Sequence, residues 1–535
     1  MGSYLNPNSG QFRESIGSGI YVDKSGLLIK TNHIFGTRQK AICLSRPRRF
    51  GKSMAAEMLA AYYGRGEDTA ALFDHLKISE DPSYREHLNQ HDVIKINMQA
   101  FLSKSKDMDD MLSMLQKRII ADLRLTYPCV DKDEVYLDWA MQSVFAATNT
   151  SFVVIIDEWD CIFREHKNDK ASQEKYLDFL RTLLKDQAYI GLAYMTGILP
   201  IKKYGTHSAL NMFSELSMTN PGGYAAFFGF TEPEVQALCD EYHMSFEEAK
   251  AWYDGYHLIE YCPGKNGAPG QDVEYSMYNP NSVVQAMVNH RYSTYWNNTE
   301  TYEALKAYIC MNQHGLKDAV IQMLAGARVR INTGTFKNDM ISMVNRDDVL
   351  TLLVHLGYLT YDFDAQTVGI PNSEVRQEFI NAISTTDWHE VIRAVESSRK
   401  LLESLWNMEE AAVAEGIDRA HEGVSILQYN DENALSYTIN LAFYYAMEYY
   451  TIIRELPTGK GYADVVYIPR KRHADKPAVV IELKYDKSAE GAIAQIEAKR
   501  YPAALSEYHG NLLLCGINYD RESKTHECKI SRLSL

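Results

Sequence analysis

The stretch that decides the fold of the N-terminal half is SRPRRFGKS at 45–53. It follows an apolar run, KAICLS at 40–45, and it opens the helix-like segment SMAAEMLAAYY. A strand, a short loop and a helix beginning at Gly-Lys-Ser form a phosphate-binding loop, in which main-chain N–H groups wrap the phosphates, the lysine reaches the outer phosphates and the serine ligates Mg²⁺. The sequence therefore predicts ATP and Mg²⁺ as ligands, bound by Arg46, Pro47, Arg48, Arg49, Phe50, Gly51, Lys52 and Ser53. Arg46 stands where the usual pattern has its first glycine.

Four apolar runs lie between residues 40 and 200 and alternate with amphipathic segments such as MDDMLSMLQKRIIADLRL. Runs that are apolar at nearly every position, separated by helices, indicate a parallel α/β sheet buried on both faces. The predicted strands are KAICLS at 40–45, DVIKINM at 92–98, SFVVIID at 151–157 and YIGLAYMTG at 189–197.

Two carboxylates follow the third predicted strand. In phosphate-loop enzymes an Asp at this strand end holds Mg²⁺ and the next Glu polarises the attacking water, so Asp157 and Glu158 are assigned these roles. The alternative is that the two carboxylates form an exposed acidic turn. Their occurrence together with the Lys52 loop disfavours this alternative. The strand at 92–98 indicates the class with an extra strand between the two motif strands. Thr196 is then a candidate sensor of the γ-phosphate, unless it simply ends its strand.

A second cluster lies near the C-terminus, in VVYIP at 465–469 and AVVIELK at 478–484. Asp464 sits on the first strand, and strand alternation puts Glu482 and Lys484 on one face of the next strand. Two converging carboxylates can hold Mg²⁺ while Lys484 orients or deprotonates a water, the arrangement that phosphodiester hydrolysis needs. A solvated strand edge is the alternative.

An ordered set of motifs carries a family resemblance: RPRRFGKS, IIDEWD, MTGIL, GFTEPEV, WYDGYHL, YNPNSV, LGYLTYD and PNSEVR. With these motifs the chain resembles the predicted AAA-ATPase-like family that carries a C-terminal PD-(D/E)XK nuclease-like domain. The resemblance runs from YVDKS at 21–25 to the chain end. That family has Arg in place of the first loop glycine, as at Arg46, and its usual Asp-Glu-Tyr-Asp has Trp159 in this chain.

The resemblance also implies site residues in the C-terminal domain. PD-(D/E)XK nucleases combine an acid, a Glu-x-Lys pair and a following helix with Gln, which correspond to the cluster above and to Gln495, with Lys499 one turn on. Glu455, preferred to Glu448, is the candidate for an additional acid. Tyr462 stands where the family often has Arg, which puts a phosphate contact in doubt.

The expected fold class is α/β: a P-loop NTPase parallel sheet, a helical middle region and a C-terminal restriction-endonuclease-like α/β domain. The predicted domains are 1–230 for the AAA-like ATPase, 231–395 for a mainly helical connector and 396–535 for the nuclease-like domain.

The net charge of the chain limits which classes of binding partner are possible. The chain has 55 Lys and Arg against 70 Asp and Glu, a net charge of −15, which excludes a generally basic nucleic-acid coat protein. Residues 451–535 hold 14 Lys and Arg against 11 Asp and Glu, so a nucleic-acid substrate is permitted there. The run 470–472, Arg-Lys-Arg, either contacts phosphates or is a solvated loop.

The compartment expected is the cytoplasm. No run reaches the roughly 18–20 apolar residues that span a bilayer, so no membrane is expected as a partner. The polar N-terminus has no apolar signal region, and the eight cysteines include no C-x-x-C pair.

The function predicted from these features is ATP binding and hydrolysis coupled to a metal-dependent phosphodiesterase. Its substrate is DNA rather than RNA, and Mn²⁺ is the alternative metal at the nuclease site. The competing hypothesis is a nucleotide-driven switch or assembly protein whose nuclease-like domain only binds nucleic acid or is structural. A homo-oligomer is left open.

Overall fold

The computed structural model describes residues 2–201, 210–262, 270–296, 302–311, 313–338, 340–384, 386, 388–423, 432–458, 461–470, 473–498, 505, 508 and 510–533. The chain forms two compact units. The first comprises Met1–Ala237, Tyr256–Val284 and Ile331–Gln366, and the second comprises Leu238–Gly255, Gln285–Arg330 and Thr367–Leu535. The three-domain division at 230 and 395 stays a prediction. Within the described residues, none of the helices is long and apolar enough to cross a membrane.

Helices and strands alternate through the first 216 residues. The helices are α1 Gly10–Ile16, α2 Gly26–Ile34, α3 Lys52–Tyr63, α4 Ala70–Phe73, α5 Tyr84–His87, α6 Met98–Leu102, α7 Met108–Thr126, α8 Leu137–Thr148, α9 Cys161–Glu165 and α10 Lys170–Leu184. The strands are β1 Ala41–Ser45, β2 Asp92–Asn97, β3 Phe152–Asp157, β4 Ile190–Gly197 and β5 Ser214–Leu216.

These five strands form one parallel sheet in the order β2-β3-β4-β1-β5. β4 lies between β1 and β3, so the predicted parallel sheet and the extra strand between the two motif strands are confirmed. The carboxyl ends of β1, β4 and β3 therefore meet at one edge of the sheet. β5 was not among the predicted strands because it has three residues, of which one is buried, and so gives no apolar run.

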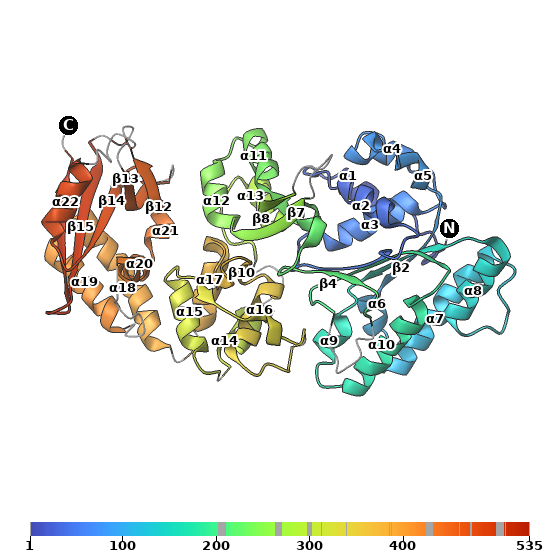
Figure 1. Ribbon diagram of the computed structural model, residues 1–535. Coiled ribbons are helices and arrows are strands. Elements are labelled where there is room, and N and C mark those ends of the chain that lie inside the picture. The colour runs from blue at the N-terminus through green and yellow to red at the C-terminus, as the bar shows by residue number, and fades with distance from the viewer. Residues whose placement is uncertain are drawn as a thin grey trace. The chain divides into compact units, whose positions relative to one another are not determined.

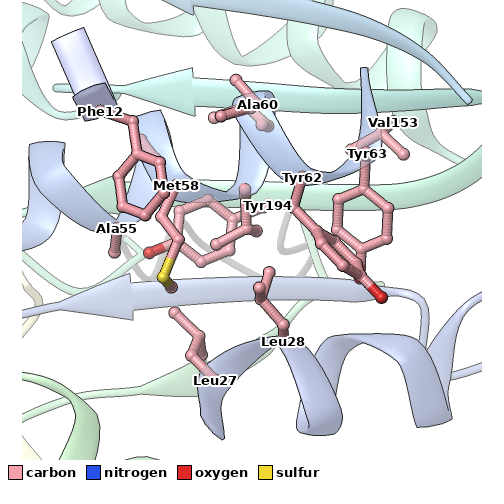
Figure 2. Packing of buried hydrophobic residues seen from close by; sticks show 14 of the residues in the cluster. Phe12, Leu27, Leu28, Ala55, Met58, Ala60, Tyr62, Tyr63, Val153 and Tyr194 are labelled. Atoms are coloured by element: carbon pink, nitrogen blue, oxygen red, sulfur yellow. The ribbon is translucent and has the colours of Figure 1, made fainter. Parts of the chain in front are cut away.

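Helices cover both faces of this sheet, α1–α5 on one and α6–α10 on the other (Figure 1). On the α3 face, Met58 and Phe12 pack in one core with Tyr194 of β4 (Figure 2). The Phe12 ring stacks on Phe73 with centroids 5.0 Å apart. Burying each such side chain contributes about 1.5–3 kcal/mol, which fixes α3, and with it the loop that precedes it, on the sheet.

The middle of the chain contains helices and short strands. They are β6 Phe230–Thr231, α11 Glu232–Glu241, α12 Phe246–Tyr253, β7 Tyr256–Cys262, β8 Gln271–Tyr278, α13 Pro280–Asn289, α14 Tyr302–Ile309, α15 Leu316–Leu324, β9 Val329–Arg330, α16 Arg346–Leu356, β10 Thr360–Asp362, β11 Thr367–Gly369 and α17 Ser373–Ile383. The antiparallel sheet β6-β8-β7 is an addition to the mainly helical region that the sequence predicts. At the start of α11, Thr231 N donates to Glu234 Oε2 at 2.8 Å.

The C-terminal part of the second unit is a mixed five-stranded sheet in the order β12-β13-β14-β15-β16, in which only β14 and β15 pair in parallel. The elements are α18 His389–Trp406, α19 Glu410–Gly423, α20 Glu432–Ala442, α21 Ala446–Tyr449, β12 Tyr450–Thr458, β13 Gly461–Pro469, β14 Ala478–Tyr485, α22 Ala489–Ala498, β15 Leu512–Asp520 and β16 Thr525–Arg532. α18–α20 pack on one face and α22 on the other (Figure 1). The two predicted strand runs lie in β13 and β14, the predicted helix is α22, and β15 and β16 follow it.

The contact between α22 and β15 depends on one glycine. A Cβ atom at Gly516 would lie 2.3 Å from the Ala489 main-chain oxygen and 2.9 Å from the Ala492 Cβ. The helix therefore packs directly on the strand backbone, and no larger residue fits without moving α22.

We expect Gly516→Ala to push α22 off the sheet and to destabilise this packing by about 1–3 kcal/mol, the usual cost of overpacking a core. Hydrogen exchange measured by mass spectrometry should speed up in α22, β14 and β15. Gly19→Ala is the control, because nothing lies within 4 Å of its added Cβ. Unchanged exchange in the Gly516 variant would show that α22 has room to spare.

Candidate active sites

The loop between β1 and α3 has the geometry of an anion site. Gly51 caps α3 with φ 88°, a left-handed conformation that glycine adopts without steric cost. Arg49 is also left-handed, at φ 65°. The Nζ of Lys52 folds back over the loop and donates to the main-chain oxygen of Pro47 at 2.8 Å. The first N–H groups of α3 and the Lys52 ammonium thus gather at one helix N-terminus, where an anion binds favourably.

Ser53 and Asp157, predicted from separate motifs, are brought together. The Ser53 hydroxyl donates to Asp157 Oδ2 at 2.8 Å. Asp157 ends β3 and is 3% exposed. Burial raises the pKa of its carboxyl, while the hydrogen bond from Ser53 and the charge of Lys52 act in the opposite direction. A hydroxyl and a carboxylate side by side are oxygen ligands of the kind that Mg²⁺ prefers.

The Lys52 ammonium is buried among charges. Burial lowers its pKa to about 8, against the opposing effect of Glu158, Asp160 and Asp157. Among the described residues its hydrogen-bond partner is the Pro47 carbonyl, and a buried ammonium with so few partners is poorly solvated. Phosphate oxygens at this place would stabilise its charged form.

Thr196 lies between the two motif strands. The register of β4 pairs it with Leu44 of β1 and with Asp157 of β3. Its hydroxyl is buried and has no hydrogen-bond partner within the described parts of the chain. A buried hydroxyl without a partner costs about 1–3 kcal/mol, so this position fits a group that hydrogen-bonds when a ligand or water arrives.

Glu158 is the residue after β3, and its backbone is left-handed at φ 57°. Its carboxylate accepts a hydrogen bond from the guanidinium of Arg164 on α9. Burial raises the pKa of Glu158, and the Arg164 charge opposes that rise. Sequence reasoning missed this arginine.

Asp160 was also missed. It is fully buried, and its Oδ2 accepts main-chain hydrogen bonds from Ile198 at 3.0 Å and Leu199 at 2.8 Å, just beyond β4. The same oxygen lies 3.3 Å from Arg164 Nε. The available signal was the i, i+4 spacing of an acid and an arginine directly after the carboxylate pair.

The side chain of Arg46 lies in the core. It is fully buried and donates to the main-chain oxygens of Ser45 at 2.9 Å and Leu216 at 3.1 Å, with its guanidinium 5.7 Å from the centre of the Phe228 ring. Burial lowers its pKa to about 10. Its main-chain N–H is bonded to Gly197 O. Arg46 therefore joins the ends of β1 and β5, and a direct contact with ATP stays a prediction.

Phe50 fixes the loop from the other side. It is buried, packs edge-on against Tyr256 with centroids 5.3 Å apart, and its main-chain oxygen accepts from Gly229 N at 3.1 Å. Arg48 and Arg49 are partly exposed. Phe50 therefore contributes packing rather than a polar contact.

The C-terminal cluster gathers on the α22 face of the sheet. Lys484 Nζ lies 3.1 Å from Glu482 Oε1, and Gln495 of α22 donates to the same oxygen. Asp464 Oδ2 accepts from the main-chain N–H of Leu483 at 2.7 Å. Glu482 is 1% exposed. The predicted residues Asp464, Glu482, Lys484 and Gln495 thus lie together.

The additional acid is placed by backbone register only. β12 pairs Arg454 with Val465 and Leu456 with Ala463, so Glu455 stands opposite Asp464 between them. The side chains of Glu455 and Glu448, and the whole of Lys499, lie outside the described residues. Within those residues, no group of three or more His, Cys, Asp and Glu could hold a metal ion.

Two further residues hold this site in place. Gly516 lets α22 approach, and Asn518 pins the turn that leads into α22, accepting from Lys487 N at 3.0 Å and donating to Lys487 O at 3.2 Å.

Arg470, from the basic run, is 3% exposed and lies 5.1 Å from the centre of the Trp252 ring, so it is neither solvated nor open to phosphate. Its two neighbours at 471–472 are outside the described residues.

Comparisons with known proteins identify both segments. Residues 11–206 match the family described as predicted AAA-ATPase, and residues 431–529 match the PD-(D/E)XK nuclease superfamily. One segment of the chain is thus similar to the predicted AAA-ATPase family and the other to the PD-(D/E)XK nuclease superfamily, as the motifs predict. Each candidate site lies within its matched segment.

One curated relative and two solved structures are similar to parts of the chain. An "uncharacterized protein in vnfD 5'region" from Azotobacter chroococcum mcd 1 is 24% identical over 385 residues, 68% of this chain, and the match spans 66% of that relative's length. The Walker-type ATPase paby2304 of Pyrococcus abyssi covers 66% of this chain and 94% of its own, at 12% identity and TM-score 0.34. The Aeropyrum pernix ORC2 protein covers 69% and 96%, at 10% identity and TM-score 0.31. The fold assignment rests on strand order rather than on these scores.

We expect Asp160→Ala to destabilise the first unit by about 2–4 kcal/mol, because two buried N–H groups lose their acceptor and Arg164 loses a counter-charge. Thermal unfolding followed by calorimetry should show a lower transition for that unit. The control is Asp178→Ala, which removes an exposed carboxylate paired with Arg181 on the surface and should change stability by less than about 1 kcal/mol. Equal effects of the two substitutions would contradict a fixing role for Asp160.

Proposed function

We propose that this chain, with its AAA-ATPase-like and nuclease-superfamily segments, binds and hydrolyses Mg²⁺·ATP in the first segment and uses it to control phosphodiester cleavage in the second. The observation that carries the ATPase proposal is the hydrogen bond between Ser53 and Asp157, beside a buried Lys52. Residues from two distant motifs meet there with oxygen ligands and a cation in the arrangement that a nucleoside triphosphate needs.

In the proposed ATPase reaction, Lys52 exchanges the Pro47 oxygen for phosphate oxygens, and Ser53 and Asp157 hold Mg²⁺. The metal supplies positive charge to the phosphates when bound. Glu158 orients the attacking water and accepts its proton, while Thr196 senses the γ-phosphate through its hydroxyl. Arg46 and Phe50 fix the loop, since both side chains are buried in the protein.

In the proposed nuclease reaction, Asp464 and Glu482 hold Mg²⁺, with Mn²⁺ as the alternative. The bound metal stabilises the charge that develops on the phosphodiester. Lys484 orients or deprotonates the water, Gln495 positions Glu482, and Glu455 supplies an additional acid. The fit is supported by the buried carboxylate of Glu482, which a cation would stabilise.

DNA is the proposed substrate, ahead of RNA, and the balance of 14 basic to 11 acidic residues in 451–535 permits it. The proposed compartment is the cytoplasm. A homo-oligomer is a further proposal, which the oligomeric state in solution tests. The second candidate function is a nucleotide-driven switch whose C-terminal domain binds nucleic acid without cutting it. Incubation with Mg²⁺ or Mn²⁺, ATP, and single- or double-stranded DNA separates the two, since only the first predicts cleavage.

Lys52→Ala should abolish ATP binding measured by calorimetry, because the buried cation that meets the phosphates is gone. Glu158→Gln should keep binding and lower turnover by about 10²–10⁴-fold, the usual contribution of a general base. Normal turnover in the Glu158 variant would show that another group activates the water.

Lys484→Ala and Asp464→Ala should abolish DNA cleavage while leaving ATP turnover within about twofold, since both residues lie in the C-terminal domain. Lys487→Ala is the matched control, an exposed lysine three residues further along. Cleavage that persists in both site variants would mean that the nuclease activity resides elsewhere or in a contaminant.

A further inference from the structure

Arg164 is a largely buried cation to which the proposed ATPase reaction gives no role. It lies on α9, four residues after Asp160, and its side chain is 10% exposed. Its guanidinium contacts two carboxylates at once, that of Glu158 and, at 3.3 Å, that of Asp160. A buried arginine between two carboxylates has little freedom to move, because breaking either pair leaves an uncompensated charge.

Asp160 fixes one side of this arrangement to the sheet. Its carboxylate accepts hydrogen bonds from the main-chain N–H groups of Ile198 and Leu199. These two residues directly follow β4, the strand that contains Thr196. A Cβ atom at Gly197 would lie 2.6 Å from Asp160 Oδ1, so the acid sits directly on this turn. Arg164 is therefore anchored at the carboxyl end of β4.

On the other side of this arrangement, Arg164 pairs with Glu158, whose position is unfavourable in two respects. The residue has a left-handed backbone, which costs a non-glycine residue roughly 1–2 kcal/mol. Its carboxylate also lies close to those of Asp157 and Asp160, which repel it. Arg164 supplies a positive charge that offsets this repulsion. The same charge also acts on Lys52, so Arg164 lies close to the lysine of the candidate ATP site.

We infer that Arg164 is a positioning residue for ATP hydrolysis, which holds the Glu158 carboxylate where it meets the attacking water. The inference rests on the proposed ATPase function. In the step concerned, the water oxygen bonds to the γ-phosphorus, the bond to the bridging oxygen breaks, and the water proton passes to Glu158. The guanidinium keeps its proton and position throughout.

The experiment compares full-length wild type with Arg164→Gln, Arg164→Lys, Glu158→Gln and the Arg164→Gln/Glu158→Gln double variant. ATP affinity is measured by calorimetry, and hydrolysis by steady-state and single-turnover rates. Arg164→Gln should lower kcat by about 10–100-fold, less than loss of the base itself, with affinity within about threefold. Arg164→Lys should regain part of the loss. In the Glu158→Gln background, Arg164→Gln should change the residual rate by less than about twofold, because a residue that acts through Glu158 has nothing left to position.

Arg181→Gln is the control, a surface arginine paired with Asp178 on α10. A rise in kcat for Arg164→Gln would overturn the inference, since the pair would then restrain Glu158 instead of positioning it. An equal loss in the Glu158→Gln background, or a loss of ATP binding, would also overturn it. Absence of Lys52-dependent turnover in the wild type would instead overturn the proposed ATPase function, and this inference with it.

Discussion

The hydrogen bond between Ser53 and Asp157 is the contact on which the N-terminal site depends. It joins the first turn of α3 to the end of β3, although 104 positions separate the two residues. The parallel pairing of β4 with both β1 and β3 brings these ends to one edge, and the core under α3 fixes the helix on the sheet. Sheet topology therefore brings together two residues from distant parts of the chain.

Both candidate sites handle the same physical problem, which is charge removed from water. A buried ion costs several kcal/mol unless it is paired and hydrogen-bonded. In the first unit, Lys52 donates a hydrogen bond to the Pro47 carbonyl, and Glu158 accepts one from Arg164. In the C-terminal sheet, the Glu482 carboxylate accepts hydrogen bonds from both Lys484 and Gln495. These partners hold the buried charges in fixed positions.

Residues whose placement follows from local spacing were predictable from the sequence, and their roles stay predictions. Lys52 follows from a loop pattern between a strand and a helix, and Glu482 with Lys484 follows from the two-residue repeat of a strand. The pairing of Arg164 with Glu158, the inward direction of Arg46 and the close approach at Gly516 were not. Each depends on a neighbour supplied by tertiary packing, which periodicity does not encode.

The most direct test is a crystal structure of the Glu158→Gln variant with ATP and Mn²⁺, in which anomalous scattering locates the metal. We expect Lys52 Nζ to be bonded to phosphate oxygens instead of Pro47 O, and the metal to lie beside Ser53 Oγ and Asp157. A nucleotide bound elsewhere, or Lys52 still on the Pro47 oxygen with nucleotide present, would contradict this expectation.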